Sequence, residues 1–166
     1  MPISTITSKS TTGVISSGTA VASTSGTSVS FTGIPSWVKR ITLMFNGVSV
    51  SGSAIVYIRL GTSSGATTSG YLGAAYYLNT GGTTQASTYW PVDGTTLGAP
   101  ATRHGNCVIT NVTGNTWAMS GSVSNSNDVG VSVTNGGIPL AATLDRVLIE
   151  VSANAFDAGT INILYE

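Results

Sequence analysis

Charged residues are scarce in this sequence, and their scarcity excludes several classes of protein. The chain of 166 residues has six basic and six acidic residues, 7% in total, where about a quarter is usual in globular domains. Without a basic patch that could neutralise phosphates, we expect no binding to nucleic acid. Intrinsic disorder is excluded too, because it needs low hydrophobicity and high net charge. Here the mean hydropathy is +0.29 and the net charge is zero, so the chain should fold as one domain.

Cysteine, long apolar runs and strong helix formers are also scarce. Cys107 is the only cysteine, which excludes an internal disulfide framework. We expect it to be a buried hydrophobic residue and not a functional thiol, because it opens the strand-like run 107–109. No stretch approaches a membrane span or the apolar part of a secretory signal, so we expect neither membrane insertion nor export by the usual signal. No window has a helical period, and Leu, Glu and Lys are too few for helices.

Ser, Thr, Gly and Asn take the place of the missing charges. Soluble monomers usually have a mixed-charge surface and a net charge away from zero, which keeps molecules apart. A surface of hydroxyls, amides and short apolar groups loses little when a partner covers it. We interpret this composition as that of a protein that assembles with others. The alternative is a small soluble monomer with a plain surface.

Short strand patterns recur along most of the chain. They are β-branched or alternating segments separated by Gly-rich turns. In the clearest of them, Ile41, Leu43 and Phe45 share one face. Residues 79–105 are less regular and predict long loops with one short strand, and residues 155–159 predict a turn. The predicted strands are Thr27–Thr32, Trp37–Val48, Ala54–Leu60, Tyr71–Leu78, Cys107–Val112, Trp117–Val123, Val129–Thr134, Leu144–Val151 and Ile161–Tyr165.

Nine or ten short strands without helices predict an all-β fold, an antiparallel β-sandwich or barrel. We favour a jelly-roll sandwich, because long central loops suit its Greek-key crossovers; an immunoglobulin-like sandwich is the alternative. Residues 1–25 are rich in Ser and Thr and contain one charge, Lys9. They predict an extended N-terminal arm or a weak edge strand, before a sandwich domain over residues 26–166.

Residues that could perform catalysis do not form a recognisable set. Glycosidic hydrolysis needs two facing carboxylates, but three of the aspartates occupy predicted turns and the other acids lie in or beside strands or at the end of the sequence. His104 is the only histidine, and we interpret it as a polar loop residue. We therefore expect no enzyme, no cofactor and no metal site, although calcium at Asp93 or Asp128 stays open. The acidic residues are Asp93, Asp128, Asp145, Glu150, Asp157 and Glu166.

Aromatic residues before and within the central region are the candidate partner contacts. Tyr and Trp are favoured in protein interfaces and can also stack on sugars. The same residues could equally lie in the core, and the sequence leaves both interpretations open. The candidates are Tyr76, Tyr77, Tyr89 and Trp90.

Two segments resemble structural proteins of tailed bacteriophages and prophages. The segment 31–49, FTGIPSWVKRITLMFNGVS, is similar to a stretch of tail-fibre tips and small virion proteins. The segments 144–147 (LDRV) and 156–166 (FDAGTINILYE) resemble the ending of the same proteins, and Ser69-Gly70-Tyr71 fits between them. Residues 72–143 match nothing.

This resemblance implies a β-sandwich in a virion, made in the bacterial cytoplasm, and a homotrimer. A short arm before a compact domain suits a capsid cement or decoration protein, whose partner is the major capsid protein. The alternative is a tail-fibre tip or other tail protein, whose partners are tail proteins or a host receptor. An unrelated soluble binding domain is the third possibility.

Overall fold

The computed structural model describes residues 15–127 and 130–166, and every regular element within these ranges is a β-strand. All strand pairs are antiparallel. The expected all-β antiparallel fold without helices is thus confirmed for the described part of the chain. The strands are β1 Ser16–Ser17, β2 Val21–Ala22, β3 Ser28–Thr32, β4 Arg40–Val50, β5 Val56–Thr62, β6 Gly65–Ala66, β7 Leu72–Tyr77, β8 Thr83–Ala86, β9 Trp90–Pro91, β10 Thr102–Thr113, β11 Thr116–Ser126, β12 Gly130–Pro139, β13 Arg146–Val151 and β14 Phe156–Tyr165.

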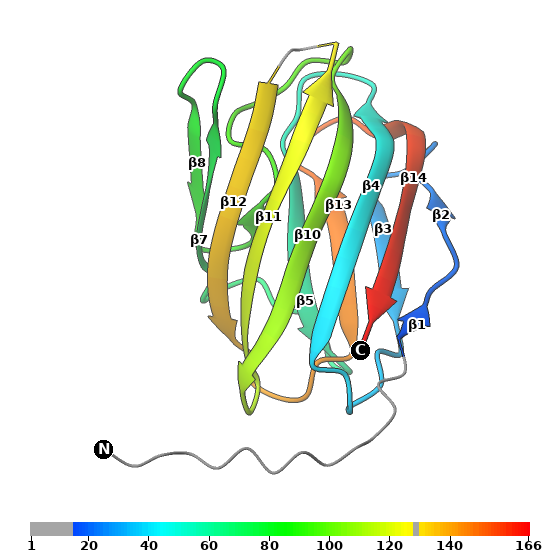
Figure 1. Ribbon diagram of the computed structural model, residues 1–166, viewed down its shortest axis with the longest axis vertical. Coiled ribbons are helices and arrows are strands. Elements are labelled where there is room, and N and C mark those ends of the chain that lie inside the picture. Colours follow the sequence, from blue (N-terminus) through cyan, green and yellow to red (C-terminus); the bar gives the residue numbers. More distant parts are fainter. Residues whose placement is uncertain (1–14, 128–129) are drawn as a thin grey trace.

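The strands form a large and a small sheet that lie one behind the other (Figure 1). The large sheet has the order β1-β14-β4-β10-β11-β12-β7-β8, with β2 also paired to β14. The small sheet has the order β3-β13-β5-β6, with β9 also paired to β5. Figure 1 looks onto the outer face of the large sheet, with the small sheet behind it.

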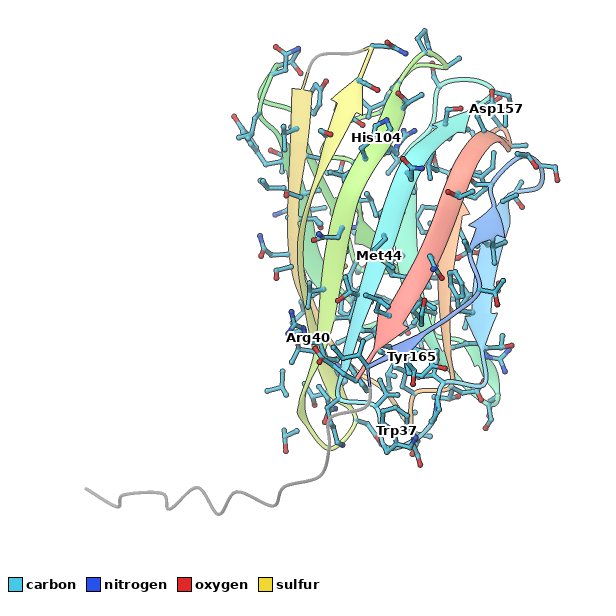
Figure 2. The ribbon with its side chains drawn as sticks, turned by 45° about the vertical axis from the view of Figure 1, so that its right-hand side comes forward. Trp37, Arg40, Met44, His104, Asp157 and Tyr165 are labelled. Carbon is cyan, nitrogen blue, oxygen red and sulfur yellow. The ribbon has the colours of Figure 1, made fainter. Side chains whose placement is uncertain are left out.

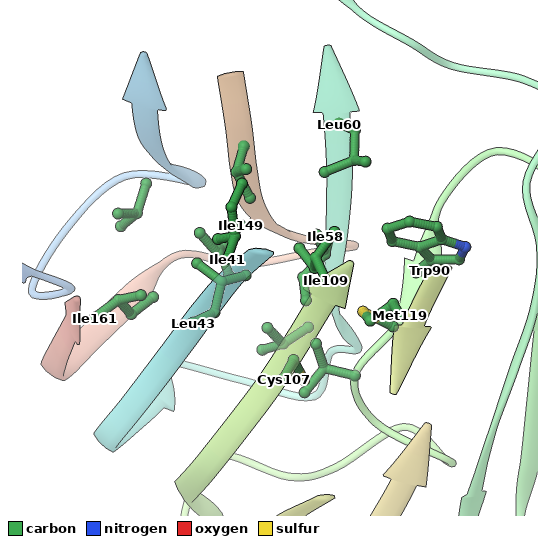
Figure 3. Packing of buried hydrophobic residues seen from close by; sticks show 14 of the residues in the cluster. Ile41, Leu43, Ile58, Leu60, Trp90, Cys107, Ile109, Met119, Ile149 and Ile161 are labelled. Carbon is green, nitrogen blue, oxygen red and sulfur yellow. The ribbon is translucent and has the colours of Figure 1, made fainter. Parts of the chain in front are cut away.

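One hydrophobic core fills the space between the two sheets (Figure 3). Because side chains alternate along a strand, Ile41, Leu43 and Phe45 all point inward from β4. Ile58 on β5 and Ile149 on β13 reach the same core from the small sheet. Each such side chain stabilises the fold by roughly 1.5–3 kcal/mol when it leaves water. The core therefore depends on both sheets at once.

The described part of the predicted arm lies along the edge of the large sheet. Ser16 and Ser17 pair with Tyr165 and Leu164 of β14, and β2 pairs with the same strand further along. Ser23 is fully buried, and its hydroxyl donates to the carbonyl of Ala158. Residues 15–25 thus form two short edge strands. The rest of the predicted arm, residues 1–14, lies outside the described residues.

Two regions differ from the pattern that the sequence predicts. Residues 79–105 contain β8 and β9 and the beginning of β10, so they are more strand-rich than expected. Residues 156–159 belong to β14 and not to a turn, because Phe156 is buried and the chain continues through two irregularities in register. Gly159 adopts a φ of 93° there, which a residue with a side chain rarely does.

Candidate protein-binding face

The outward-facing side chains of the large sheet line up in rows that cross seven strands. We call this surface the outer face. The pairing of β14, β4, β10, β11, β12, β7 and β8 places two full rows side by side. The first row is Leu164, Thr42, Val108, Ser120, Asn135, Ala74 and Gln85; the second is Asn162, Met44, Asn106, Ser122, Val133, Tyr76 and Thr83.

Neither row contains a charged residue, and none of these side chains is buried. Adjacent strands are about 4.8 Å apart, so seven strands give a surface roughly 30 Å wide. Figure 2 shows this face, with Met44 near its middle, His104 toward its upper end and Arg40 at its lower end. The result is a broad area of short hydroxyl, amide and apolar groups.

Four of the five acidic residues in the described part of the chain form ion pairs with arginines, and none of these pairs lies in the middle of the outer face. Arg59 pairs with Glu150 at 3.0 Å and Arg146 with Asp145 at 2.9 Å, both on the small-sheet side. A third pair, Arg40 with Glu166 at 3.1 Å, lies at the lower end of β4. The small sheet therefore presents charged side chains to solvent, whereas the charges of the large sheet lie toward its ends, at Arg40 with Glu166 and at the exposed Asp157, and leave the two rows without charge (Figure 2).

The fourth ion pair lies inside the protein. Asp93 and Arg103 are fully buried, with 2.9 Å between Arg103 Nε and Asp93 Oδ1 and 2.8 Å between Nη2 and Oδ2. The backbone N–H of Val56 also donates to Asp93 Oδ2 at 2.7 Å. Burial raises the pKa of the Asp93 carboxyl, and the Arg103 guanidinium opposes that rise. The expected turn role of Asp93 is thus wrong: its carboxylate contacts β10 and β5.

The Asp93–Arg103 pair uses the carboxylate at which the sequence had left a calcium site open. Both oxygens of Asp93 already accept hydrogen bonds from protein donors, and Asp128 lies outside the described residues. Within the described ranges, no three His, Cys, Asp or Glu side chains come together as metal ligands.

His104 lies in β10 and not in the loop where we expected it. Its Nδ1 atom accepts a hydrogen bond of 3.2 Å from the backbone N–H of Gly47. Gly47 has a φ of 67°, and the register of β10 against β4 shifts between Arg103 and Gly105. The imidazole therefore satisfies a backbone donor at an irregularity of the sheet.

Cys107 lies in the core, as we expected from its run of apolar neighbours. Burial, together with a smaller effect of the nearby Asp93 carboxylate, raises the pKa of its thiol to about 12. The thiol consequently stays protonated near neutral pH, which makes it a poor nucleophile.

The four aromatic candidates do not form one surface. Tyr77 and Trp90 lie in the interior, with 2% and 0% of their surface exposed. Tyr76 points the opposite way from Tyr77, as consecutive residues of a strand must, and is 44% exposed on the outer face. Tyr89 is half-buried on the small-sheet side, where it stacks on Tyr57 at 4.2 Å. The structure therefore separates the candidates that proximity in sequence had grouped.

The rows of the outer face are the feature that sequence reasoning missed. Each strand shows only one or two of their members, and nothing in a single strand indicates which residues of another strand lie beside them. The signal that could have found them is the lack of charge at the outward positions of β10, β11 and β12.

No family model, curated protein or solved structure matches this chain. Within residues 15–127 and 130–166, no helix is long and apolar enough to cross a membrane.

Proposed function

We propose that this chain is a structural protein of a bacteriophage virion, a capsid cement or decoration protein that binds neighbouring capsid subunits through its outer face. The resemblance of residues 31–49 and 156–166 to phage virion proteins supports the virion. The neutral outer face supports the mode of binding. Its location would be the assembled virion, after synthesis in the bacterial cytoplasm.

The strand order supports a jelly-roll sandwich. A jelly roll has eight strands in two Greek keys, with the first, eighth, third and sixth strands in one sheet and the second, seventh, fourth and fifth in the other. Numbering β3, β4, β5, β7, β8, β9, β12 and β13 as one to eight gives β3-β13-β5-β9 in the small sheet. The large sheet then reads β4, β12, β7, β8, with the β10–β11 hairpin inserted between β4 and β12 and with β14, β1 and β2 added beyond β4. Viral capsid proteins are among those that use this architecture.

The neutral outer face is the observation that carries the proposal. Covering a charged side chain costs desolvation energy unless the partner supplies a matching charge. Ser, Thr, Asn and Ala side chains avoid that cost, and the shorter ones lose little conformational freedom. A capsid repeats the same contact many times, so a modest free energy per copy can stabilise the whole particle.

Ser122 is the position at which to test this proposal, because it is exposed in the middle of β11 within the second row. We expect Ser122→Lys to weaken binding to particles that lack the protein by about tenfold or more, since a buried unpaired charge costs several kcal/mol. The matched control is Ser30→Lys, at an exposed position of β3 in the small sheet, which should bind like the unmodified protein. Bound copies per particle and the temperature of particle disruption are the measurements.

Equal binding by both lysine variants would reject the outer face as the docking surface. If the unmodified protein does not bind capsids at all, the cement proposal fails.

A tail-fibre tip, or another tail protein that recognises a host receptor, is the second candidate. One observation favours it: Trp37 is 50% exposed at one end of the molecule, with its ring 6.0 Å from that of Tyr165 (Figure 2). Exposed aromatic rings suit receptor contacts. Competition of the purified protein with phage adsorption to host cells, lost in Trp37→Ala, would support this candidate over the first.

A further inference from the structure

The dipeptide Asn-Gly occurs twice in the sequence, at residues 46–47 and 135–136. Both asparagines are exposed, Asn46 on β4 and Asn135 on β12 of the large sheet. In this dipeptide the backbone nitrogen of the glycine can attack the asparagine side chain with little obstruction, because glycine has no side chain of its own. The two pairs share this local chemistry and differ in what the fold places around them.

Asn135 and Gly136 lie in a regular part of the sheet. Gly136 pairs with Met119 of β11 on one side and with Gly73 of β7 on the other. Asn135 is likewise paired on both sides. The peptide group between the two residues is therefore held in place by both neighbouring strands.

Gly47, by contrast, has no paired residue on either neighbouring strand. The register shifts at this point of β4 against both β10 and β14, and Gly47 has a φ of 67°. The side-chain amide of Asn46 has no hydrogen-bond partner among the described residues. The Gly47 nitrogen thus lies at an irregularity of the sheet, beside a side chain that is free to turn toward it.

A basic group contacts this same nitrogen. His104 Nδ1, on β10, accepts a hydrogen bond of 3.2 Å from the Gly47 N–H. A neutral imidazole nitrogen that accepts a hydrogen bond carries no proton, so Nδ1 is the ring nitrogen that can take one. A general base must lie within hydrogen-bond reach of the proton that it removes. His104 meets this condition toward the upper end of the outer face (Figure 2).

We propose that Asn46 is a site of self-catalysed deamidation in which His104 is the general base. The Gly47 nitrogen forms a bond to Asn46 Cγ, its proton passes to His104 Nδ1, and the bond from Cγ to Nδ2 breaks. Nδ2 takes the proton from His104 and leaves as ammonia, and a succinimide ring remains. Water then opens the ring at either carbonyl, which leaves an aspartate or an isoaspartate. The reaction needs water alone, and its first step joins two groups that are already neighbours.

The modification adds a carboxylate to the outer face. Asn46 follows Met44 as the next outward residue of β4, so the new charge borders the second row. The chemistry itself does not depend on capsid binding. One consequence does rest on the proposed function: aged protein should bind capsids less well than fresh protein, because covering an unpaired charge costs free energy.

The test is peptide mass spectrometry of the native protein during incubation at neutral pH, with Asn135 as the matched control in the same chain. We expect Asn46 to convert about tenfold or more faster than Asn135, since a positioned base contributes factors of this size or larger. His104→Gln still offers an oxygen to the Gly47 N–H but supplies no base, so it should slow Asn46 to the rate of Asn135. In urea, where the fold is lost, the two asparagines should convert at similar rates.

Three results would overturn the proposal. They are native Asn46 converting no faster than Asn135, the same ratio of rates in urea as in the native protein, and an unchanged rate at Asn46 in folded His104→Gln. Circular dichroism establishes whether that variant folds. If it does not, diethyl pyrocarbonate can block His104, the only histidine in the sequence, in the native protein and should slow Asn46 alone. Because all these rates are measured on the free protein, their outcome is separate from that of the capsid-binding experiment.

Discussion

At the scale of single residues, the buried Asp93–Arg103 pair shows how the fold handles a charge in its interior. Three hydrogen bonds between 2.8 and 3.0 Å join the two side chains, and the N–H of Val56 and the carbonyl of Ala101 complete the set. Replacing such a pair by apolar residues is often neutral, whereas removing one partner leaves a buried charge uncompensated. The pair is therefore a point at which single substitutions should be harmful.

We expect Arg103→Leu to lower the free energy of unfolding by about 3–5 kcal/mol. The double variant Asp93→Asn/Arg103→Leu should recover part of that loss, because the amide oxygen still accepts from Val56 and no charge remains. Arg59→Leu is the control, since the Arg59–Glu150 pair is partly exposed and should cost about 1 kcal/mol. Urea denaturation measures all three variants. If the double variant is no more stable than Arg103→Leu, the unpaired charge of Asp93 is not the cause of the lost stability.

Cys107 gives a second prediction at this scale, on pH dependence. Its pKa is about 12 in the folded protein and about 8.5 in an unfolded chain. Because folding raises this pKa, the buried protonated thiol contributes stability that is fully present below about pH 8.5 and is lost as the pH rises toward 12. Tyr71, whose pKa burial also raises to about 12, acts in the same direction above about pH 10.

We therefore expect the free energy of unfolding to fall between about pH 9 and 12, and to fall less in Cys107→Ala. At neutral pH that variant should lose only about 1 kcal/mol, from a small cavity. A thiol reagent should label the native protein slowly and the unfolded protein rapidly. Fast labelling of the native protein would mean that the thiol is accessible, contrary to its burial.

At the scale of elements, the edge of the large sheet depends on β1 and β2. Gly18 donates its N–H to Ile163 at 2.8 Å, and Ser23 donates its N–H to Gly159 at 2.9 Å. These strands cover one side of β14, which would otherwise be the sheet edge. An unprotected edge strand is a site of aggregation.

The consequence is a difference between two truncations of the N-terminal arm. Removing residues 1–14 leaves β1 and β2 in place, so we expect a folded protein with a nearly unchanged melting temperature. Removing residues 1–25 deletes both strands and the buried Ser23, and should lower the melting temperature and promote aggregation. Thermal melts and light scattering compare the two. Equal melting temperatures would show that residues 15–25 contribute little to the fold, and capsid binding by each form would show where the arm acts.

Period-two patterns made the presence of the longer strands predictable but not their bounds, since β10 begins at Thr102 and not at Cys107, and β12 ends at Pro139 and not at Thr134. Ile41, Leu43 and Phe45 in β4, and Val147, Ile149 and Val151 in β13, face the core as their alternation indicates. Of the short strands β8 and β9, one was expected within residues 79–105 but could not be placed, because two to four residues carry too little pattern. Asp93 was misread for a different reason: Asp-Gly is a strong local turn signal, and its true partner, Arg103, is ten residues further along.

At the scale of the whole molecule, the sequence predicted the class of fold but not the surface that results from it. The outer face depends on the pairing of seven strands, and partners such as Thr42 and Leu164 are far apart in the chain. The low charge content was visible in the composition. Its distribution, with two ion pairs on the small-sheet side, depends on pairing between Arg59 and Glu150 and on the placement of Asp145 beside Arg146. Tyr76 and Tyr89 likewise lie on different sides of the molecule, because the chain passes from the large sheet to the small sheet between β8 and β9.

The shared core also predicts how the molecule unfolds. Trp90 belongs to β9 of the small sheet and Trp117 to β11 of the large sheet, and both are buried in the same hydrophobic cluster. Because neither sheet can keep its apolar face covered without the other, we expect one cooperative transition. For 166 residues, its enthalpy should be about 116 kcal/mol, from about 0.7 kcal/mol per residue.

The measurement uses the two buried tryptophans as separate reporters. In a Trp37→Phe background, Trp117→Phe leaves only Trp90 and Trp90→Phe leaves only Trp117, so each variant reports on one sheet. Within each variant, tryptophan fluorescence and far-ultraviolet circular dichroism should change at the same temperature, and the calorimetric and van't Hoff enthalpies should agree. Comparison within a variant removes the stability cost of the substitution itself. If Trp90 fluorescence changes at a lower temperature than the circular dichroism of its own variant, the small sheet unfolds first, and the two sheets do not act as one cooperative unit.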